Sequence, residues 1–178
     1  STFFHEEVFP VLTPLAVDHA RPFPFISNLS LNLGVYLERD INGEVSLEFA
    51  RIKVPVDILP RLVRLEDVMY NYRGVEESSY HYLWIEDIIR SNLTELFPGM
   101  TIAEAYPFRV LRNADIDYEH EQEDEMLDVK SIIEQSVRER RFGSVVRLSV
   151  PAEISTRMLN FLNTSLHVQS ARDVYMIE

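Results

Sequence analysis

The sequence predicts an α+β fold, in which about three helices pack on a mostly antiparallel sheet. Apolar residues alternate with polar ones over residues 29–37, the period of two that is typical of a strand with one face in a core. The pair Asn42-Gly43 then favours a tight hairpin turn into a second apolar stretch. Further strands and helices follow without a regular strand–helix–strand alternation, which argues against a parallel sheet.

Residues 1–28 are predicted to form a proline-rich segment, and residues 29–178 a single α+β domain of a longer chain. Proline lacks an N–H and favours extended geometry in the residue before it, so helix is expected only before the first proline. The stretch beyond it is stiff and apolar, and we expect it to pack on the domain or on a partner. Because the sequence stops inside an apolar run, we also expect an excised piece of a longer protein. The prolines of this segment are Pro10, Pro14, Pro22 and Pro24.

The second arm of the predicted hairpin, over residues 45–54, shifts its hydrophobic phase at Ala50. Such a shift indicates either a β-bulge or burial on both faces, and it leaves more than one strand pairing open. A short apolar run at 62–65 and a strand at 80–84 follow. Helical spacing predicts helices over residues 85–97, ended by Pro98-Gly99, and over 126–137 and 154–162; the remaining strands are expected at 105–111, 144–150 and 174–177.

Composition and charge exclude several classes of protein. The 178 residues contain 17 Lys and Arg against 29 Asp and Glu, a formal net charge of −12, which disfavours nucleic acids and anionic lipid surfaces as partners. The chain has no cysteine, which excludes disulfides and Cys-based metal sites and fits a reducing compartment. No stretch approaches the ~20 apolar residues of a membrane span. We therefore expect a cytoplasmic domain, with membrane association only through the rest of the parent chain.

The spacing of glycine and histidine argues against common catalytic sites. The closest glycines, Gly34 and Gly43, are too far apart for a phosphate-binding loop or a dinucleotide fold. None of the five histidines has a partner four residues away with which to chelate a metal on a helix. We expect no catalytic, cofactor-binding or metal-binding residue in this chain.

Two groups of residues are candidates for binding. Arg138, Arg140 and Arg141, with Arg147 in the next strand, would hold an anion such as phosphate, although complementation of a helix C-terminus explains most of them. The aromatic and proline residues of the N-terminal segment are predicted either to pack in the core or to form a domain or subunit interface. The interface candidates are Phe9, Pro10, Pro14, Pro22, Phe23, Pro24 and Phe25.

Two further groups have stronger structural explanations. The acidic run 115–128, with His120, is either a site for a divalent metal or a basic partner or, as we favour, a solvated loop leading into a helix. Tyr80, Tyr82 and Trp84 share one face of a strand, and core or interface packing is favoured over base stacking in so acidic a chain.

Three blocks of this sequence resemble the family of bacterial polyphosphate kinases. They follow the order of the family and span nearly the whole chain, where they correspond to the domain called the head. That domain lies between an N-terminal helical domain and two C-terminal catalytic domains. The blocks are Phe9-Pro10-Val11-Leu12-Thr13-Pro14-Leu15-Ala16-Val17-Asp18 with Pro22-Phe23-Pro24-Phe25-Ile26-Ser27-Asn28-Leu29-Ser30-Leu31-Asn32-Leu33; Glu95-Leu96-Phe97-Pro98-Gly99-Met100 with Tyr106-Pro107-Phe108-Arg109-Val110 and Ala114-Asp115; and Arg140-Arg141-Phe142-Gly143 with Val146-Arg147-Leu148.

The resemblance implies that the parent enzyme reversibly transfers the terminal phosphate of ATP to inorganic polyphosphate, using magnesium and a phosphohistidine. The family's nucleophilic histidine sits in a Lys-Thr-His-Ala-Lys-like motif, and since no histidine here has lysine neighbours, no catalytic role carries over. The residues that bind ATP and magnesium are implied to lie in other domains. The head is implied to have the shape of a phosphoinositide-binding PX module and to help form a dimer.

The prediction is thus a scaffolding and dimerising head domain, inactive alone, whose partners are the remaining domains of the kinase, a second subunit and, indirectly, polyphosphate. The alternative is an autonomous module that binds polyphosphate or phosphoinositide through the four arginines. A stand-alone enzyme is the poorest hypothesis, because no base, nucleophile and oxyanion donor can be named.

Overall fold

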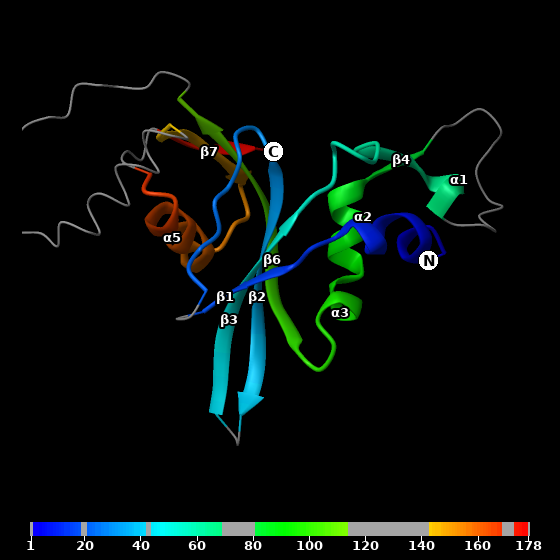
Figure 1. Cartoon of the computed structure of the whole chain (residues 1–178), viewed down its shortest axis with the longest axis horizontal. Coiled ribbons are helices and arrows are strands. Elements are labelled where there is room, and N and C mark those ends of the chain that lie inside the picture. Colours follow the sequence, from blue (N-terminus) through cyan, green and yellow to red (C-terminus); the bar gives the residue numbers. More distant parts are fainter. Residues whose placement is uncertain are drawn as a thin grey trace, which may run out of the picture. The chain divides into compact units, whose positions relative to one another are not determined.

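The computed structural model describes residues 2–18, 21–41, 44–68, 81–113, 143–168 and 173–177. The chain divides into two compact units, the first made of Ser1–Ile26 and Ser30–Phe108 and the second of Ser27–Leu29 and Arg109–Glu178. Most strand pairs are antiparallel, and helices accompany them (Figure 1), so the predicted α+β class is confirmed. The predicted boundary between residues 28 and 29 stays a prediction.

In the first unit, the strands are hydrogen-bonded in the order β1-β3-β2-β6. The strands β2 (Leu31–Ile41) and β3 (Glu44–Lys53) form the long hairpin of Figure 1, and their register is unbroken from Ile41↔Glu44 to Asn32↔Lys53. Strand β1 (Leu15–Val17) pairs antiparallel with β3, although the sequence predicted irregular structure there. Strand β6 (Thr101–Arg112) extends from this unit into the second.

The hairpin is buried on both faces, whereas alternation in its first arm predicted one buried face. Residues 30–37 are all buried, and so are residues 49–52 on the opposite arm. Because the register is continuous there, the phase shift at Ala50 reflects burial on both faces rather than a bulge. Leu29, expected in the strand, is exposed in a turn before it, with a positive φ of 60°.

The first face of the hairpin, which carries Leu33, Val35 and Ile52, forms a core with the N-terminal helices and α2. The π-helix η1 (Phe4–Val8) buries Phe4 and Val8, and α2 (Ile85–Ser91) buries Ile85, Ile88 and Ile89. A 3-10 helix, η2 (Phe9–Val11), continues past Pro10, one turn beyond the expected end, because a proline at the start of a helix needs no N–H partner.

The helix predicted over residues 85–97 is divided at Asn92. Its side-chain Nδ2 donates to the carbonyl of Ile88 at 2.7 Å, a local bond that competes with the helix, and α3 (Leu93–Leu96) follows. The predicted stop is present, with Gly99 at a φ of 80°. Upstream, β4 (Leu62–Arg64), which leads into α1 (Leu65–Val68), pairs with β5 (Tyr82–Trp84) in a separate two-stranded sheet.

In the second unit, the strand order is β6-β7-β8. Strand β7 (Val145–Pro151) is antiparallel to β6, and β8 (Val174–Ile177) is parallel to β7, so the sheet is mixed. Helix α5 (Thr156–Ser165) begins after Ser155, whose Oγ accepts a hydrogen bond from the amide of Met158 at 3.0 Å. The strands and the helix predicted here are confirmed, whereas the helix predicted over 126–137 lies outside the described residues.

The short piece Ser27–Leu29 belongs to the second unit, although the chain on either side of it belongs to the first. The amide of Leu29 donates to the carbonyl of Val110 at 2.8 Å, and Oδ1 of Asn28 accepts from the amide of Arg112 at 2.9 Å. These two bonds attach the piece to β6.

Candidate functional site

The predicted interface residues are divided between exposed and half-buried positions. Phe9 and Phe25 are 42% and 45% exposed, and Pro10 and Pro22 are also exposed. The other members of the group, Pro14, Phe23 and Pro24, are half-buried. The segment therefore packs in part on its own unit and still presents two large aromatic side chains to solvent.

Phe23 shows how the segment packs. Its ring centroid lies 5.7 Å from that of Phe49, and the Phe49 ring meets Tyr36 edge-to-face at 5.6 Å across the hairpin. Such aromatic pairs contribute roughly 0.5–1.5 kcal/mol beyond the burial of their area. The proline-rich segment thus helps to bury the second face of the hairpin, which an isolated hairpin would leave in solvent.

Arg51 lies on that second face and is a buried cation, with 8% of its surface exposed. Its Nε donates to Oδ1 of Asn32 at 2.7 Å, and Nδ2 of Asn32 donates to the carbonyl and Oγ of Ser30 at 3.0 and 3.1 Å. Burial lowers the pKa of the Arg51 guanidinium, because desolvation disfavours its charged form. Since all three side chains are buried, this network holds a cation inside the unit and does not present it to a ligand.

The β4–β5 ribbon has an exposed aromatic face. Tyr82 and Trp84 are each about half exposed, so core packing, one of the two favoured predictions, is wrong for them. The two faces of this ribbon differ in burial. Val63 lies on the buried face, and Tyr82 and Trp84 lie on the opposite, exposed face of this two-stranded sheet. Interface packing stays a prediction, and Tyr80 lies outside the described residues. The Arg61 guanidinium stacks 4.5 Å from the Trp84 ring and reaches Oε1 of the buried Glu86 at 2.6 Å.

Arg147 is the one predicted anion contact within the described residues, since Arg138, Arg140 and Arg141 lie outside them, as does the acidic run 115–128 with His120. Its guanidinium carbon lies 3.9 Å from the ring centroid of Tyr175, and its Nε donates to Oγ of Ser149 at 3.1 Å. Both contacts fix the orientation of a side chain that is exposed to solvent.

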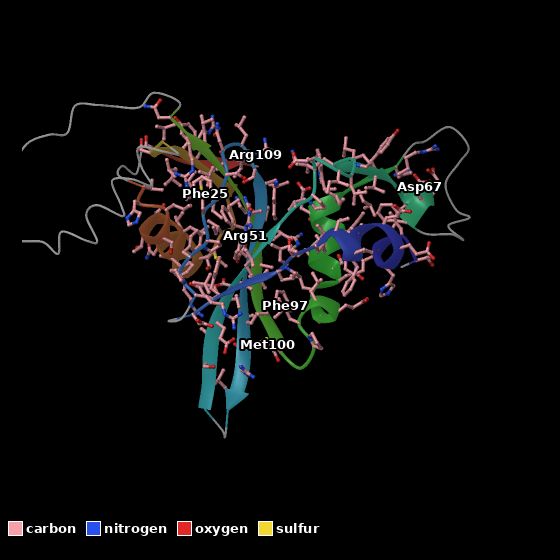
Figure 2. The ribbon with its side chains drawn as sticks, viewed as in Figure 1. Phe25, Arg51, Asp67, Phe97, Met100 and Arg109 are labelled. Atoms are coloured by element: carbon pink, nitrogen blue, oxygen red, sulfur yellow. The ribbon has the colours of Figure 1, made fainter. Side chains whose placement is uncertain are left out.

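Arg109, which is labelled in Figure 2, is a second cation on the face of the β6-β7-β8 sheet that carries Arg147. It was not among the candidates predicted from the sequence. It is the register partner of Ser149, and Ser149 is in turn the partner of Tyr175. Because residues two apart on a strand share a face, Arg147 projects to the same side as Ser149. The register between β6 and β7 places the two arginines on one face, and alternation within either strand alone does not show this.

Neither arginine has a carboxylate partner among the residues that the structure describes. Within the same ranges, no three His, Asp or Glu side chains come together as a possible metal site, and no helix is long and apolar enough to cross a membrane. Exposed aromatic rings and the arginines at 109 and 147 are therefore the candidate side chains for recognition in this part of the chain.

These features define an α+β module with exposed aromatic and arginine side chains. Over residues 1–178 the chain matches the family model described as the polyphosphate kinase middle domain, and it belongs to that family. This confirms the resemblance that the three sequence blocks predicted.

Individual relatives agree with this assignment. The chain is 44% identical over 178 residues to polyphosphate kinase 1 of Chlorobaculum tepidum and 47% identical over 175 residues to the polyphosphate kinase of Prosthecochloris aestuarii. These matches cover 100% and 98% of this chain but only 24% and 23% of the relatives, so the chain spans about a quarter of their length. A crystal structure of polyphosphate kinase from Porphyromonas gingivalis matches 98% of this chain and 22% of its own, with a TM-score of 0.67 and 25% identity.

Proposed function

We propose that this chain is the non-catalytic head domain of a polyphosphate kinase and that it acts as a scaffold, contacting other domains of its parent and a second subunit. The observation that carries the proposal is the exposure of Phe9 and Phe25 in a segment whose Phe23 packs on its own unit. Exposed large aromatic side chains are enriched at protein–protein interfaces. The half-exposed Tyr82 and Trp84 are a second surface of this kind.

The complete protein is proposed to transfer the terminal phosphate of ATP reversibly to inorganic polyphosphate in the cytoplasm. Two observations support this assignment: the family membership and the names of the relatives. Phosphoryl transfer requires positioned cations around the transferred group and a nucleophile or acceptor. We propose that ATP and magnesium bind in domains outside this chain, and that the chain positions those domains.

A labelling experiment tests the non-catalytic role. The 178-residue chain and the complete protein are incubated with magnesium and ATP labelled at its terminal phosphate. We expect label in polyphosphate and in the protein for the complete protein only. Covalent label on the 178-residue chain by itself would contradict the proposal.

The scaffold role is tested by the oligomeric state. Phe9→Ser and Phe25→Ser in the complete protein are expected to shift a dimer toward monomer in sedimentation measurements. Ile58→Ser is the matched control, because Ile58 is a more exposed apolar residue in a turn outside the segment. An unchanged dimer in the Phe9→Ser, Phe25→Ser double variant would remove the N-terminal segment from the proposed interface.

The alternative function, an anion-binding module, has one specific observation in its favour. Arg147 is held in a fixed orientation at the surface and has no carboxylate partner among the described residues.

A further inference from the structure

We propose that Arg109, Arg147, Ser149 and Tyr175, on one face of the β6-β7-β8 sheet, form a binding site for a phosphate-bearing polyanion. We call these four residues the arginine face. The inference deepens the alternative function above, since it places the site on one sheet face and adds three residues to Arg147. It does not depend on the scaffold role.

Arg147 is organised for phosphate binding before any ligand arrives. One flat side of its guanidinium covers the Tyr175 ring at 3.9 Å, and its Nε is bonded to Ser149. The two terminal nitrogens remain, and their N–H groups match two oxygens of one phosphate. Because stacking already restricts the side chain, binding costs less conformational entropy than it would for an unrestrained arginine.

Arg109 supplies the second positive charge. Arg109, Ser149 and Tyr175 are register partners on three neighbouring strands, which lie about 4.7–4.9 Å apart in a sheet. Arg147 is the diagonal neighbour of Arg109 across the β6–β7 pair, a position for which side-chain separations are about 7–8 Å. Two flexible cations at that separation reach one phosphate or two adjacent phosphates of a chain.

Carboxylate pairing is common among the described cations of the first unit, whereas Arg109 and Arg147, like Arg51 and Arg157, have no carboxylate partner among the described residues. Six described cations of the first unit each have a carboxylate within 4.0 Å, as expected in a chain with 29 Asp and Glu. Two like charges on one sheet face repel each other, and a bound polyanion would turn this repulsion into attraction. The six paired cations are Arg21, Arg39, Lys53, Arg61, Arg64 and Arg90.

The same features select among anions. A net charge of −12 disfavours a long nucleic acid, which would need a broad basic surface. The Tyr175 ring is covered by Arg147 on one side and is therefore a poor platform for base stacking. A ligand with concentrated charge and tetrahedral oxygens fits better, and both short polyphosphate and a phosphorylated lipid headgroup have this chemistry.

Titration of the isotope-labelled 178-residue chain with tripolyphosphate, followed by amide and arginine Nε NMR signals, tests the site. We expect saturable shifts confined to β6, β7, β8 and the Nε–H of Arg147.

In Arg109→Gln or Arg147→Gln the dissociation constant should rise on the order of tenfold or more, because a charge-assisted hydrogen bond is lost. Arg157→Gln is the control, since it removes the same charge from an exposed position on α5 in the same unit. Tyr175→Ala should weaken binding by releasing Arg147, while Tyr175→Phe should not.

A second arm distinguishes the two sources of phosphate. Phosphatidylcholine vesicles with and without a phosphoinositide are sedimented with the chain. Binding to tripolyphosphate supports a soluble ligand, and binding to phosphoinositide vesicles alone supports a headgroup.

Absence of saturable binding in both arms overturns the proposal, as do shifts that persist unchanged in Arg109→Gln and Arg147→Gln. If a variant loses its native spectrum, the unsubstituted chain still tests the proposal: shifts confined to β6, β7 and β8 support it, and shifts elsewhere contradict it. None of these measurements involves dimerisation or ATP turnover, so failure here is separate from failure of the scaffold role.

Discussion

The arginines that stack on aromatic rings in the two units differ in their bonded partner, which is Glu86 for Arg61 and Ser149 for Arg147. In the first unit, Arg51 is buried on an amide network and Arg61 stacks on Trp84 while it neutralises Glu86. In the second unit, Arg147 also stacks on a ring, that of Tyr175, but its bonded partner is a neutral hydroxyl. The comparison teaches that an arginine stacked on a ring can have either a carboxylate partner, as Arg61 has, or a neutral one, as Arg147 has. In the proposal above, the arginine without a carboxylate is the one available to an anion.

The largest expected effect concerns the backbone of the second unit. Gly143 has a φ of 70°, and a Cβ there would lie 1.9 Å from the carbonyl oxygen of Asn113. Gly143→Ala must therefore move backbone in addition to adopting a strained φ, and we expect a loss of stability on the order of 3 kcal/mol. Denaturant unfolding of the 178-residue chain measures it.

Gly99→Ala in the first unit is the matched control for Gly143→Ala. Gly99 has a similar φ of 80°, but nothing lies within 4 Å of an added Cβ. Only the strain remains, and the expected cost is about 1–2 kcal/mol. Equal costs at both glycines would mean that the close approach to Asn113 is easily relieved.

The next effect tests the structural arginine of the first unit. Asn32→Ala removes the acceptor of a buried guanidinium, which should cost about 2–4 kcal/mol. Arg51→Met leaves only Oδ1 of Asn32 without its donor and should cost about 1–2 kcal/mol. Arg147→Met in the second unit should change stability by less than about 0.5 kcal/mol, because the side chain is exposed.

Thermal and denaturant unfolding near neutral pH compares these three variants. Burial lowers the pKa of Arg51. While Arg51 is charged in both the folded and the unfolded chain, its desolvation destabilises the folded chain. This penalty is relieved only as pH rises through the pKa that Arg51 has in the folded chain. The ordinary pKa of arginine lies far above neutrality, so the stability difference between Arg51→Met and the unsubstituted chain should be flat around neutral pH. A larger cost for Arg147→Met than for Asn32→Ala would reverse the comparison between the units.

Two phenylalanines of the N-terminal segment test how it divides its contacts. Phe23→Ala removes a ring that packs on Phe49 and should destabilise the chain by about 1–3 kcal/mol. Phe25→Ala, at an exposed position, should cost less than about 0.5 kcal/mol in the 178-residue chain and act instead on assembly of the complete protein. A stability loss at Phe25 as large as at Phe23 would place its role in folding.

The smallest effect is expected at the start of α5. Ser155→Ala removes the hydroxyl that accepts from the amide of Met158, and the loss should be about 1 kcal/mol. Ser155→Asp, which retains an acceptor, is the control and should keep most of the stability. Thermal unfolding of both variants separates loss of the cap from a general effect of substitution.

Much of this architecture could be predicted from local signals. Alternation placed the strands of the hairpin, and the Pro98-Gly99 pair placed the end of a helix. Burial of the second hairpin face was one of two interpretations of the phase shift at Ala50, and the sequence could not decide between them, because this burial depends on Phe23 folding back onto Phe49. Strand β1 was missed for a related reason: its three residues gain their hydrogen bonds only from β3, which is distant in sequence.

The candidate site was less predictable than the fold. Arg147 was identified because it follows a cluster of arginines in the sequence, a weak reason. Its actual neighbours, Arg109 and Tyr175, come from strands on either side of β7. A single sequence does not reveal which strands pair, so it could not bring these three residues together.

Ser27–Leu29 belongs to the second unit, while the chain before and after it belongs to the first, and this limits where the protein can be cut into two folded pieces. Because Asn28 and Leu29 supply bonds to β6, a piece that starts at residue 109 lacks part of its own unit. Each unit is built from two separate stretches of the chain, so exchange of one unit between relatives would require several crossovers at once. Evolution by a single exchange of the N-terminal or C-terminal half is therefore disfavoured.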